Sequence, residues 1–176
     1  EIDLQGESNI KLRKKGTWNI VDLATSSFGQ GVSVTPIQFI RAVSAIANNG
    51  YLVSPKVVNT GEKNKHIQII SKEAANQTTA MMIESAKHGE SQWTNLKGFS
   101  VAGKTGTAQI PISGHYDAEK TIASFVGFAP ANNPKFIMLV TLKEPQSSQW
   151  ASETAAPLWY SIAKDLFNHF GIQPEN

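Results

Sequence analysis

The chain of 176 residues contains no cysteine, which excludes disulfides and thiolate metal sites. Its histidines lie far apart, and none has a ligand spacing such as H-x-x-x-H, so we expect no metal site. The four are His66, His88, His115 and His169. The longest apolar run, residues 136–140, is far too short to span a bilayer. No signal-peptide pattern opens the chain, and its first residue is Glu1, which indicates a piece of a longer protein.

Charge is also sparse. The formal net charge is +2, and 17% of the residues are charged against 40% that are hydrophobic, as in a globular domain with a sizeable core. The densest basic patch lies within residues 11–15, and acidic residues lie nearby in residues 1–7. This mixture is typical of a solvated loop, so we expect no nucleic-acid partner.

Helices dominate the first half of the sequence. Residues 1–31 are expected to be loop with a short helix. Thr35 and Pro36 then open a helix that ends at Gly50, and residues 51–58 suit a short extended piece. Ser71 caps a second helix. The predicted inner faces are Ile37, Ile40, Val43 and Ala47 on the first helix, and Ala75, Thr79, Met82, Ile83 and Ala86 on the second.

Strands dominate the second half. We expect strands at residues 99–110, 121–129 and 135–144, with a tight turn at 130–134. Residues 136–140 are apolar on both faces, as in a central strand covered on both sides. A final helix spans about residues 155–170, and its apolar face is predicted at Leu158, Ile162, Leu166 and Phe170. The pattern predicts an α/β (α+β) fold over residues 1–176, with an antiparallel sheet flanked by helices.

Two chemistries fit Lys104-Thr105-Gly106. Together with Gly98, these residues match the phosphate-loop pattern G-x-x-x-x-G-K-[ST], which needs a helix directly after the lysine. Residues 99–102 suit a strand rather than a loop, and Gly106 and Pro111 prevent a helix from starting there. We therefore expect no nucleotide.

The second interpretation places the same tripeptide inside a strand. Gly103 and Gly106 would allow a ligand or a second backbone to approach closely, and an edge strand could pair with an extended peptide. Lys104 would supply positive charge for a carboxylate, and Thr105 and Thr107, on one face, would supply hydroxyl donors. By itself the tripeptide favours an ordinary edge strand with a solvated lysine, because three residues are weak evidence for a site.

Six segments, in order and across nearly the whole chain, resemble the transpeptidase domain of class B penicillin-binding proteins. They are IDLQGE at 2–7, DLATSSFGQGVSVTPIQ at 22–38, AIANNG at 45–50, VAGKTGTAQ at 101–109, ASFVGFAPA at 123–131 and AAP at 155–157. The resemblance implies an extracytoplasmic, membrane-anchored enzyme that crosslinks peptidoglycan stem peptides through a serine acyl-enzyme, needs no cofactor and binds β-lactam antibiotics.

The resemblance also implies roles for residues of the K-T-G strand. Lys104 would set the electrostatics of the site. Thr105, Gly106 and Thr107 would bind the substrate, whose carboxylate the two threonines hold. The backbone N–H of Thr107 would form half of the oxyanion hole. Gln109 and the loop at residues 28–31 would lie near the cleft.

Two motifs of that family are missing. S-x-N does not occur, and neither S-x-x-K match, at residues 8–11 and 161–164, is in a suitable place. The first lies downstream of where the family carries its nucleophile, and the second lies on the solvated face of the last helix. We therefore expect that the nucleophile is absent from the chain, that the amino-terminal part of the same domain is a partner, and that the chain alone is inactive.

The resemblance implies that the first strands of the domain pair beside the strand expected at residues 135–144. Without them this strand has an open edge, which predicts a homodimer, a strand-swapped assembly or a nicked domain. Two alternatives to a transpeptidase also remain. One is a β-lactam sensor or β-lactamase of the same fold, and the other is a non-catalytic binding or assembly module.

Overall fold

The computed structural model describes residues 2, 5–8, 10–14, 16–58, 61, 67–112 and 115–175, without the side chains of residues 112 and 115–119. Its helices are α1 (Ile20–Ser26), α2 (Pro36–Ala47), α3 (Lys72–His88) and α4 (Ala155–His169), with a 3-10 turn η1 (Gln92–Thr94). Its strands are β1 (Tyr51–Leu52), β2 (Ile67–Gln68), β3 (Ala102–Ile112), β4 (His115–Ala129) and β5 (Phe136–Lys143).

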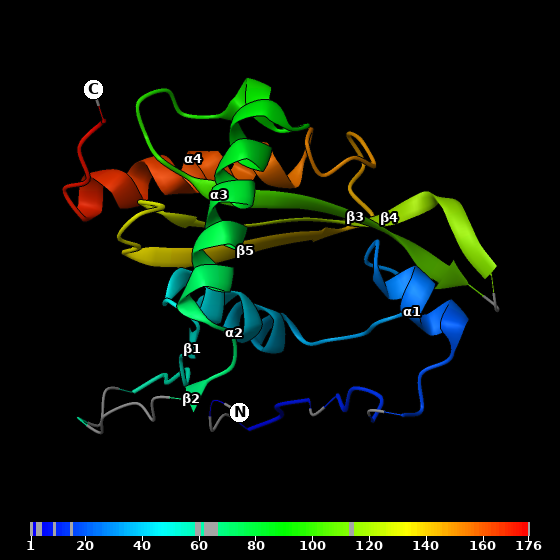
Figure 1. The fold of residues 1–176 in the computed structure, drawn as a ribbon. Helices are drawn as coiled ribbons and strands as arrows, with labels where there is room; N and C mark the ends of the chain where they lie inside the picture. Colours follow the sequence, from blue (N-terminus) through cyan, green and yellow to red (C-terminus); the bar gives the residue numbers. More distant parts are fainter. Residues whose placement is uncertain are drawn as a thin grey trace.

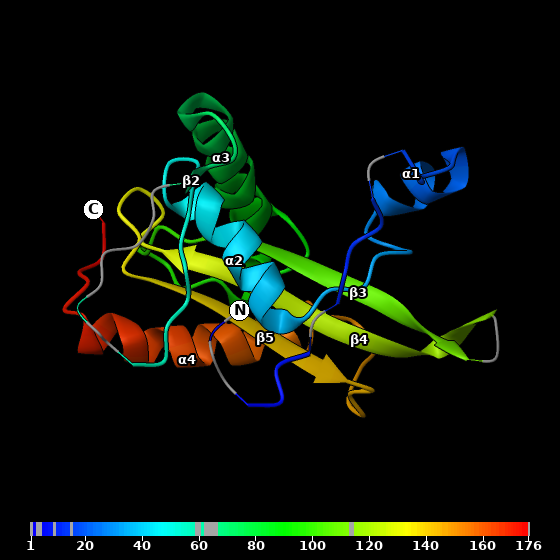
Figure 2. The same cartoon turned by 90° about the horizontal axis from the view of Figure 1, so that it is seen from below.

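The main sheet has the order β3-β4-β5, with both pairs antiparallel. The helix α4 lies along one face of this sheet, while α2 and α3 cover the other (Figure 1). Figure 2 shows the same three layers from below, with the short helix α1 standing apart from them. The predicted antiparallel sheet flanked by helices is confirmed.

The larger core lies between the sheet and α4, and it is rich in aromatic side chains. Trp159 is fully buried, its ring lies 5.2 Å from that of Phe125, and its Nε1 donates a hydrogen bond to the carbonyl of Met138 at 2.9 Å. A second core joins α2 and α3 to the opposite face through Val43, Met82 and Phe128. Each face of the sheet therefore buries its own apolar layer.

The predicted helix starts are confirmed at both caps. Thr35 and Gln38 form a reciprocal capping box at α2, and the Ser71 hydroxyl accepts from the backbone N–H of Ala74 at 3.1 Å. The carboxyl of Glu73 has a lowered pKa, first because of a backbone hydrogen bond in this turn and then because of Ser71. Gly50 follows α2 with a φ of +95°, and a Cβ there would lie 2.2 Å from the carbonyl oxygen of Ile70.

The predicted apolar face of the last helix is wrong. Phe170 follows α4 and its ring stacks on that of Phe136 in β5, but Leu158 and Ile162 are exposed and Leu166 is only half-buried. Most side chains that meet the sheet lie on a different face of α4. These are Ala155, Ala156, Trp159, Tyr160, Ala163 and Phe167. This face combines small alanines, which let the helix approach the sheet closely, with the large aromatic side chains that fill the core.

Other boundaries also differ from the predictions. The first strand of the sheet begins at Ala102 rather than at residue 99, and the extended piece expected at 51–58 is a strand only at Tyr51–Leu52. Both faces of β5 are covered as predicted, but it is not a central strand. In the described part of the chain it pairs with β4 alone.

Candidate active site

Lys104, Thr105 and Gly106 lie in the middle of β3, paired with Val126, Phe125 and Ser124 of β4. Among the described residues β3 has no second neighbour in the sheet, so the edge that carries this tripeptide is open. No helix follows Thr105, because β3 continues to Ile112. The strand interpretation is confirmed, and the geometry of a phosphate loop is absent from this segment.

Alternation along β3 sends neighbouring residues to opposite faces. Lys104 and Gly106 lie on the side of α2 and α3, where they border an apolar pocket of about 270 Å³. The rest of its lining comprises Phe39, Val43, Ile46, Met82, Thr105, Ser124 and Val126. A groove with an apolar wall therefore runs beside the open edge of the strand.

Thr105 and Thr107 alternate with Lys104 and Gly106 along the strand, and their hydroxyls have different partners. The Thr107 hydroxyl accepts a hydrogen bond from the backbone N–H of Ala151 at 3.1 Å, so its own proton remains available to a ligand. The Thr105 hydroxyl donates to Oε2 of Glu90 at 3.2 Å. The Lys104 ammonium folds around the edge and donates to the carbonyl oxygen of Thr105 at 3.0 Å and to its hydroxyl at 3.3 Å.

The two glycines of the motif serve different purposes. A Cβ on Gly103 would lie 2.5 Å from the ring of Phe125, so this glycine makes room for the core and not for a ligand. The prediction that Gly103 admits a ligand is therefore wrong. A Cβ on Gly106 would meet nothing within 4 Å, which leaves that position open to an incoming group.

Gln109 is exposed farther along β3, at the last regular pair with Thr121 before the register shifts. Its exposure leaves its amide accessible, but no hydrogen bond in the described residues ties it to the tripeptide. The sequence missed two groups that the fold brings to this strand, Glu90 and the N–H of Ala151. Neither belongs to a motif, because both come from loops that only the tertiary fold places beside β3.

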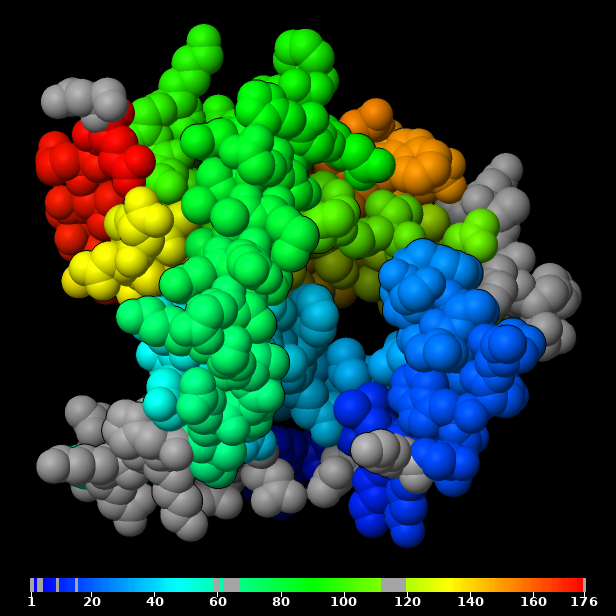
Figure 3. Space-filling view, in the orientation of Figure 1, coloured from blue at the N-terminus to red at the C-terminus, as the bar shows by residue number. Residues whose placement is uncertain are grey.

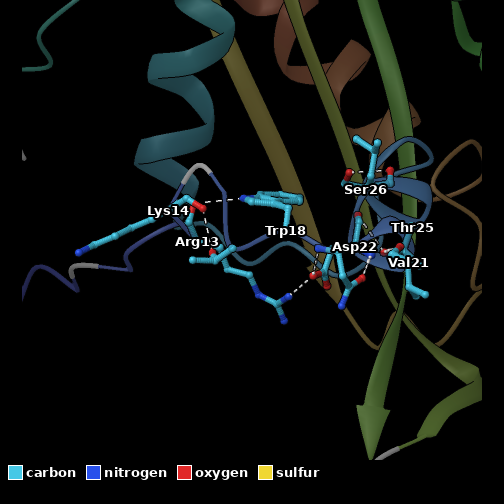
Figure 4. A network of polar contacts seen from close by, with 10 residues as sticks. Arg13, Lys14, Trp18, Val21, Asp22, Thr25 and Ser26 are labelled. Carbon is cyan, nitrogen blue, oxygen red and sulfur yellow. Dashed lines mark hydrogen bonds and ion pairs between the residues drawn. The ribbon is translucent and has the colours of Figure 1, made fainter.

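The segment that carries α1 is held by local polar contacts (Figure 4). Asn19 and Asp22 form a capping box, Arg13 pairs with Asp22, and the indole Nε1 of Trp18 donates to the carbonyl of Arg13 at 3.2 Å. No residue of α1 is buried. Figure 3 shows a hollow that separates the helices α2 and α3 from this segment. After α1 the segment continues into the loop at residues 28–31.

Neither S-x-x-K match has the geometry of a nucleophile and its lysine. Ser161 and Lys164 are exposed on α4, and no hydrogen bond joins them. Ser8 is exposed, and residue 9 of the first match lies outside the described residues. The described residues contain no cluster that could hold a metal ion and no helix long and apolar enough to cross a membrane.

Comparison with known proteins decides the family. Residues 1–167 match the model of the penicillin binding protein transpeptidase domain. The chain belongs to this family. It is 37% identical to stage V sporulation protein D of Bacillus subtilis, covering 98% of this chain and 29% of that protein. It is 33% identical to peptidoglycan D,D-transpeptidase FtsI of Buchnera aphidicola, covering 99% of this chain and 32% of that protein.

Solved structures agree. The transpeptidase domain of Burkholderia pseudomallei penicillin-binding protein 3 superposes with a TM-score of 0.90 at 28% identity, covering 100% of this chain and 54% of that one. Penicillin-binding protein 3 of Mycobacterium tuberculosis complexed with ampicillin gives 0.84 at 27% identity, covering 99% of this chain and 43% of that one. The chain thus has the fold of part of a transpeptidase domain and spans about a third of the curated relatives.

Proposed function

We propose that this chain forms the substrate-binding wall of a peptidoglycan D,D-transpeptidase. The observation that carries the proposal is the position of Lys104-Thr105-Gly106 at an open strand edge beside an apolar pocket, in a chain of the transpeptidase family. An extended stem peptide added at this edge would gain backbone hydrogen bonds from β3. The names of the relatives support the same reaction.

In this proposal a serine outside the chain attacks the peptide bond of a D-Ala-D-Ala terminus, expels the terminal D-alanine and forms an acyl-enzyme. An amine of a neighbouring stem peptide then attacks the ester and releases the serine. Lys104 supplies a positive potential for the substrate carboxylate. Thr105 and Thr107 donate hydroxyl hydrogen bonds, and the N–H of Thr107 stabilises the developing oxyanion. Gly106 leaves room for the peptide, and Gln109 contacts it farther along.

We further propose that the amino-terminal part of the same domain covers the apolar surfaces left open here. The pocket beside Lys104 is one, and the exposed side chains of α1 and the outer face of α4 are others. The exposed residues include Ile20 and Leu23 on α1, Phe28 in the loop that follows it, and Leu158 and Ile162 on α4. Surfaces of this kind mark interfaces in soluble proteins. Because the chain belongs to the transpeptidase family, we also propose that the longer protein is extracytoplasmic and membrane-anchored and that penicillins acylate it.

The open edge of β5 offers a second docking position. It is apolar and pairs with β4 alone among the described residues, so another chain could extend the sheet there. A homodimer, a strand-swapped assembly or the rest of the domain would each satisfy this edge. A strictly monomeric chain by light scattering would argue against the homodimer and the strand-swapped assembly, and would leave the rest of the domain as the proposed occupant.

Labelling with a fluorescent penicillin tests the proposed wall. In a domain extended toward the amino terminus, Lys104→Ala should lower the rate of acylation by about 100-fold. Lys164→Ala, which removes the same charge from the outer face of α4, should leave it unchanged. Equal rates for Lys104→Ala and the unchanged domain would refute the role of Lys104.

A further inference from the structure

The loop between α3 and β3 places a carboxylate on the hydroxyl that the proposed function assigns to the substrate. Oε2 of Glu90 accepts a hydrogen bond from the Thr105 hydroxyl at 3.2 Å, and that same hydroxyl accepts one from the Lys104 ammonium at 3.3 Å. A hydroxyl has only one proton to donate. Thr105 therefore cannot donate to an incoming carboxylate while it donates to Glu90.

We propose that Glu90 is a specificity-determining residue, which competes with the carboxylate of the ligand for the Thr105 hydroxyl and for the positive potential of Lys104. This inference rests on the proposed function, because it takes Thr105 as part of the carboxylate site. Thr107 has no such competitor among the described residues, since its hydroxyl accepts from the backbone N–H of Ala151 and keeps its own proton. The two threonines of one site thus differ: Thr107 is ready to bind, and Thr105 must first release Glu90.

The electrostatic part of this competition is modest but measurable. Glu90 and Thr105 meet at the exposed edge of the sheet, where water screens charges strongly. Two like charges about 4 Å apart repel by about 1 kcal/mol in water and by more where a bound ligand excludes water. A ligand carboxylate on Thr105 would lie at about this distance from Glu90, so removing the charge should strengthen its binding by about fivefold to tenfold.

The effect should appear in binding and not in the chemical step. Glu90 contacts Thr105, whereas the attacking serine lies outside the chain and the oxyanion donor is the N–H of Thr107 in the proposed site. The rate of acylation at saturating ligand should therefore stay constant, while the ligand concentration that gives half of that rate falls. A residue with a merely structural role would not separate the two quantities in this way.

Acylation of the amino-terminally extended domain by benzylpenicillin tests the inference. Glu90→Gln keeps a hydrogen-bond acceptor and removes the charge, and Glu90→Ala removes both. We expect the half-saturating penicillin concentration to fall about fivefold to tenfold in Glu90→Gln and at least as far in Glu90→Ala, with an unchanged maximal rate. Added salt should narrow the difference from the unchanged domain, because it screens the repulsion.

Glu84→Gln is the matched control, because it removes the same charge from the exposed surface of α3, where Glu84 faces His88. Its kinetics should match those of the unchanged domain. Unchanged or weaker penicillin binding in both Glu90 variants would overturn the inference. Failure of the unchanged domain to be acylated at all would instead refute the proposed function, so the two failures are distinguishable. Thermal unfolding of each variant shows whether it is folded.

Discussion

Two regions of this chain, the sheet with α4 and the segment around α1, differ in how much apolar surface they bury. The sheet and α4 enclose an aromatic core in which Trp159, Phe125 and Phe167 are almost fully buried. The segment around α1 buries no residue of its helix and depends on a capping box, one ion pair and a few local hydrogen bonds. The first region buries an apolar core of its own, while the α1 segment leaves apolar side chains such as Ile20 and Leu23 exposed. The candidate site lies on β3, in the first of these two regions.

The largest expected effect comes from the aromatic core. Trp159→Ala removes a fully buried side chain and the hydrogen bond to Met138, so it should lower the free energy of unfolding by about 3–5 kcal/mol. Leu158→Ala, the preceding residue on the same helix but 42% exposed, should cost less than about 1 kcal/mol. Urea denaturation of both variants measures the difference. Similar losses would show that α4 does not pack on the face seen here.

A pH experiment probes the same core. Burial raises the pKa of Tyr160 to about 12, and a poorly aligned approach of Ser91 only partly opposes the rise. Because the pKa in the folded state is above the ordinary value of 10.0, the contribution of Tyr160 to the free energy of unfolding is complete below pH 10 and is lost between pH 10 and about 12. The loss should be on the order of 2–3 kcal/mol.

Tyr160→Phe isolates this contribution, because it keeps the ring and removes the ionisable hydroxyl. The unfolding free energies of both proteins, measured from neutral to alkaline pH, should diverge above pH 10. Parallel curves would mean that Tyr160 ionises in the folded state as easily as in water.

The two glycines near the candidate site sharpen the comparison within one strand. Gly103→Ala drives a methyl group against the ring of Phe125 and should destabilise the fold by about 1–3 kcal/mol. Gly106→Ala meets no neighbour within 4 Å, so the melting temperature should barely change while penicillin acylation of the extended domain slows. Destabilisation by Gly106→Ala but not by Gly103→Ala would contradict this assignment, because it would mean that the core packs against Gly106 and that the space beside Gly103 is open.

The smallest expected effect lies in the α1 segment. Asn19→Ala breaks the capping box of α1 and should cost that helix about 1 kcal/mol. Amide hydrogen exchange should show the loss within α1, with no change in global unfolding. Ser71→Ala removes a comparable cap from α3, which packs on the sheet, so its cost should appear in global unfolding. A global effect of Asn19→Ala would show that α1 belongs to the main core.

The sequence predicted what short-range rules determine. Thr35-Pro36 and Ser71 mark helix starts through local hydrogen bonds. Gly106 and Pro111 exclude a helix after Lys104, which left a strand as the prediction for this segment. The packed face of α4 was not predictable in the same way. Its alanines carry little hydrophobic signal, although they decide how closely the helix meets the sheet. Glu90 was also beyond reach, because no local pattern links it to Thr105 fifteen residues later.

The central claim is that this chain carries the Lys104 wall of an acyl-transfer site and that its serine lies elsewhere. Intact-mass measurement after incubation with a fluorescent penicillin tests it most directly, on this chain and on a domain extended toward the amino terminus. We expect one covalent adduct on the extended domain and none on residues 1–176. An adduct on the chain alone, mapped to Ser8 or Ser161, would contradict it.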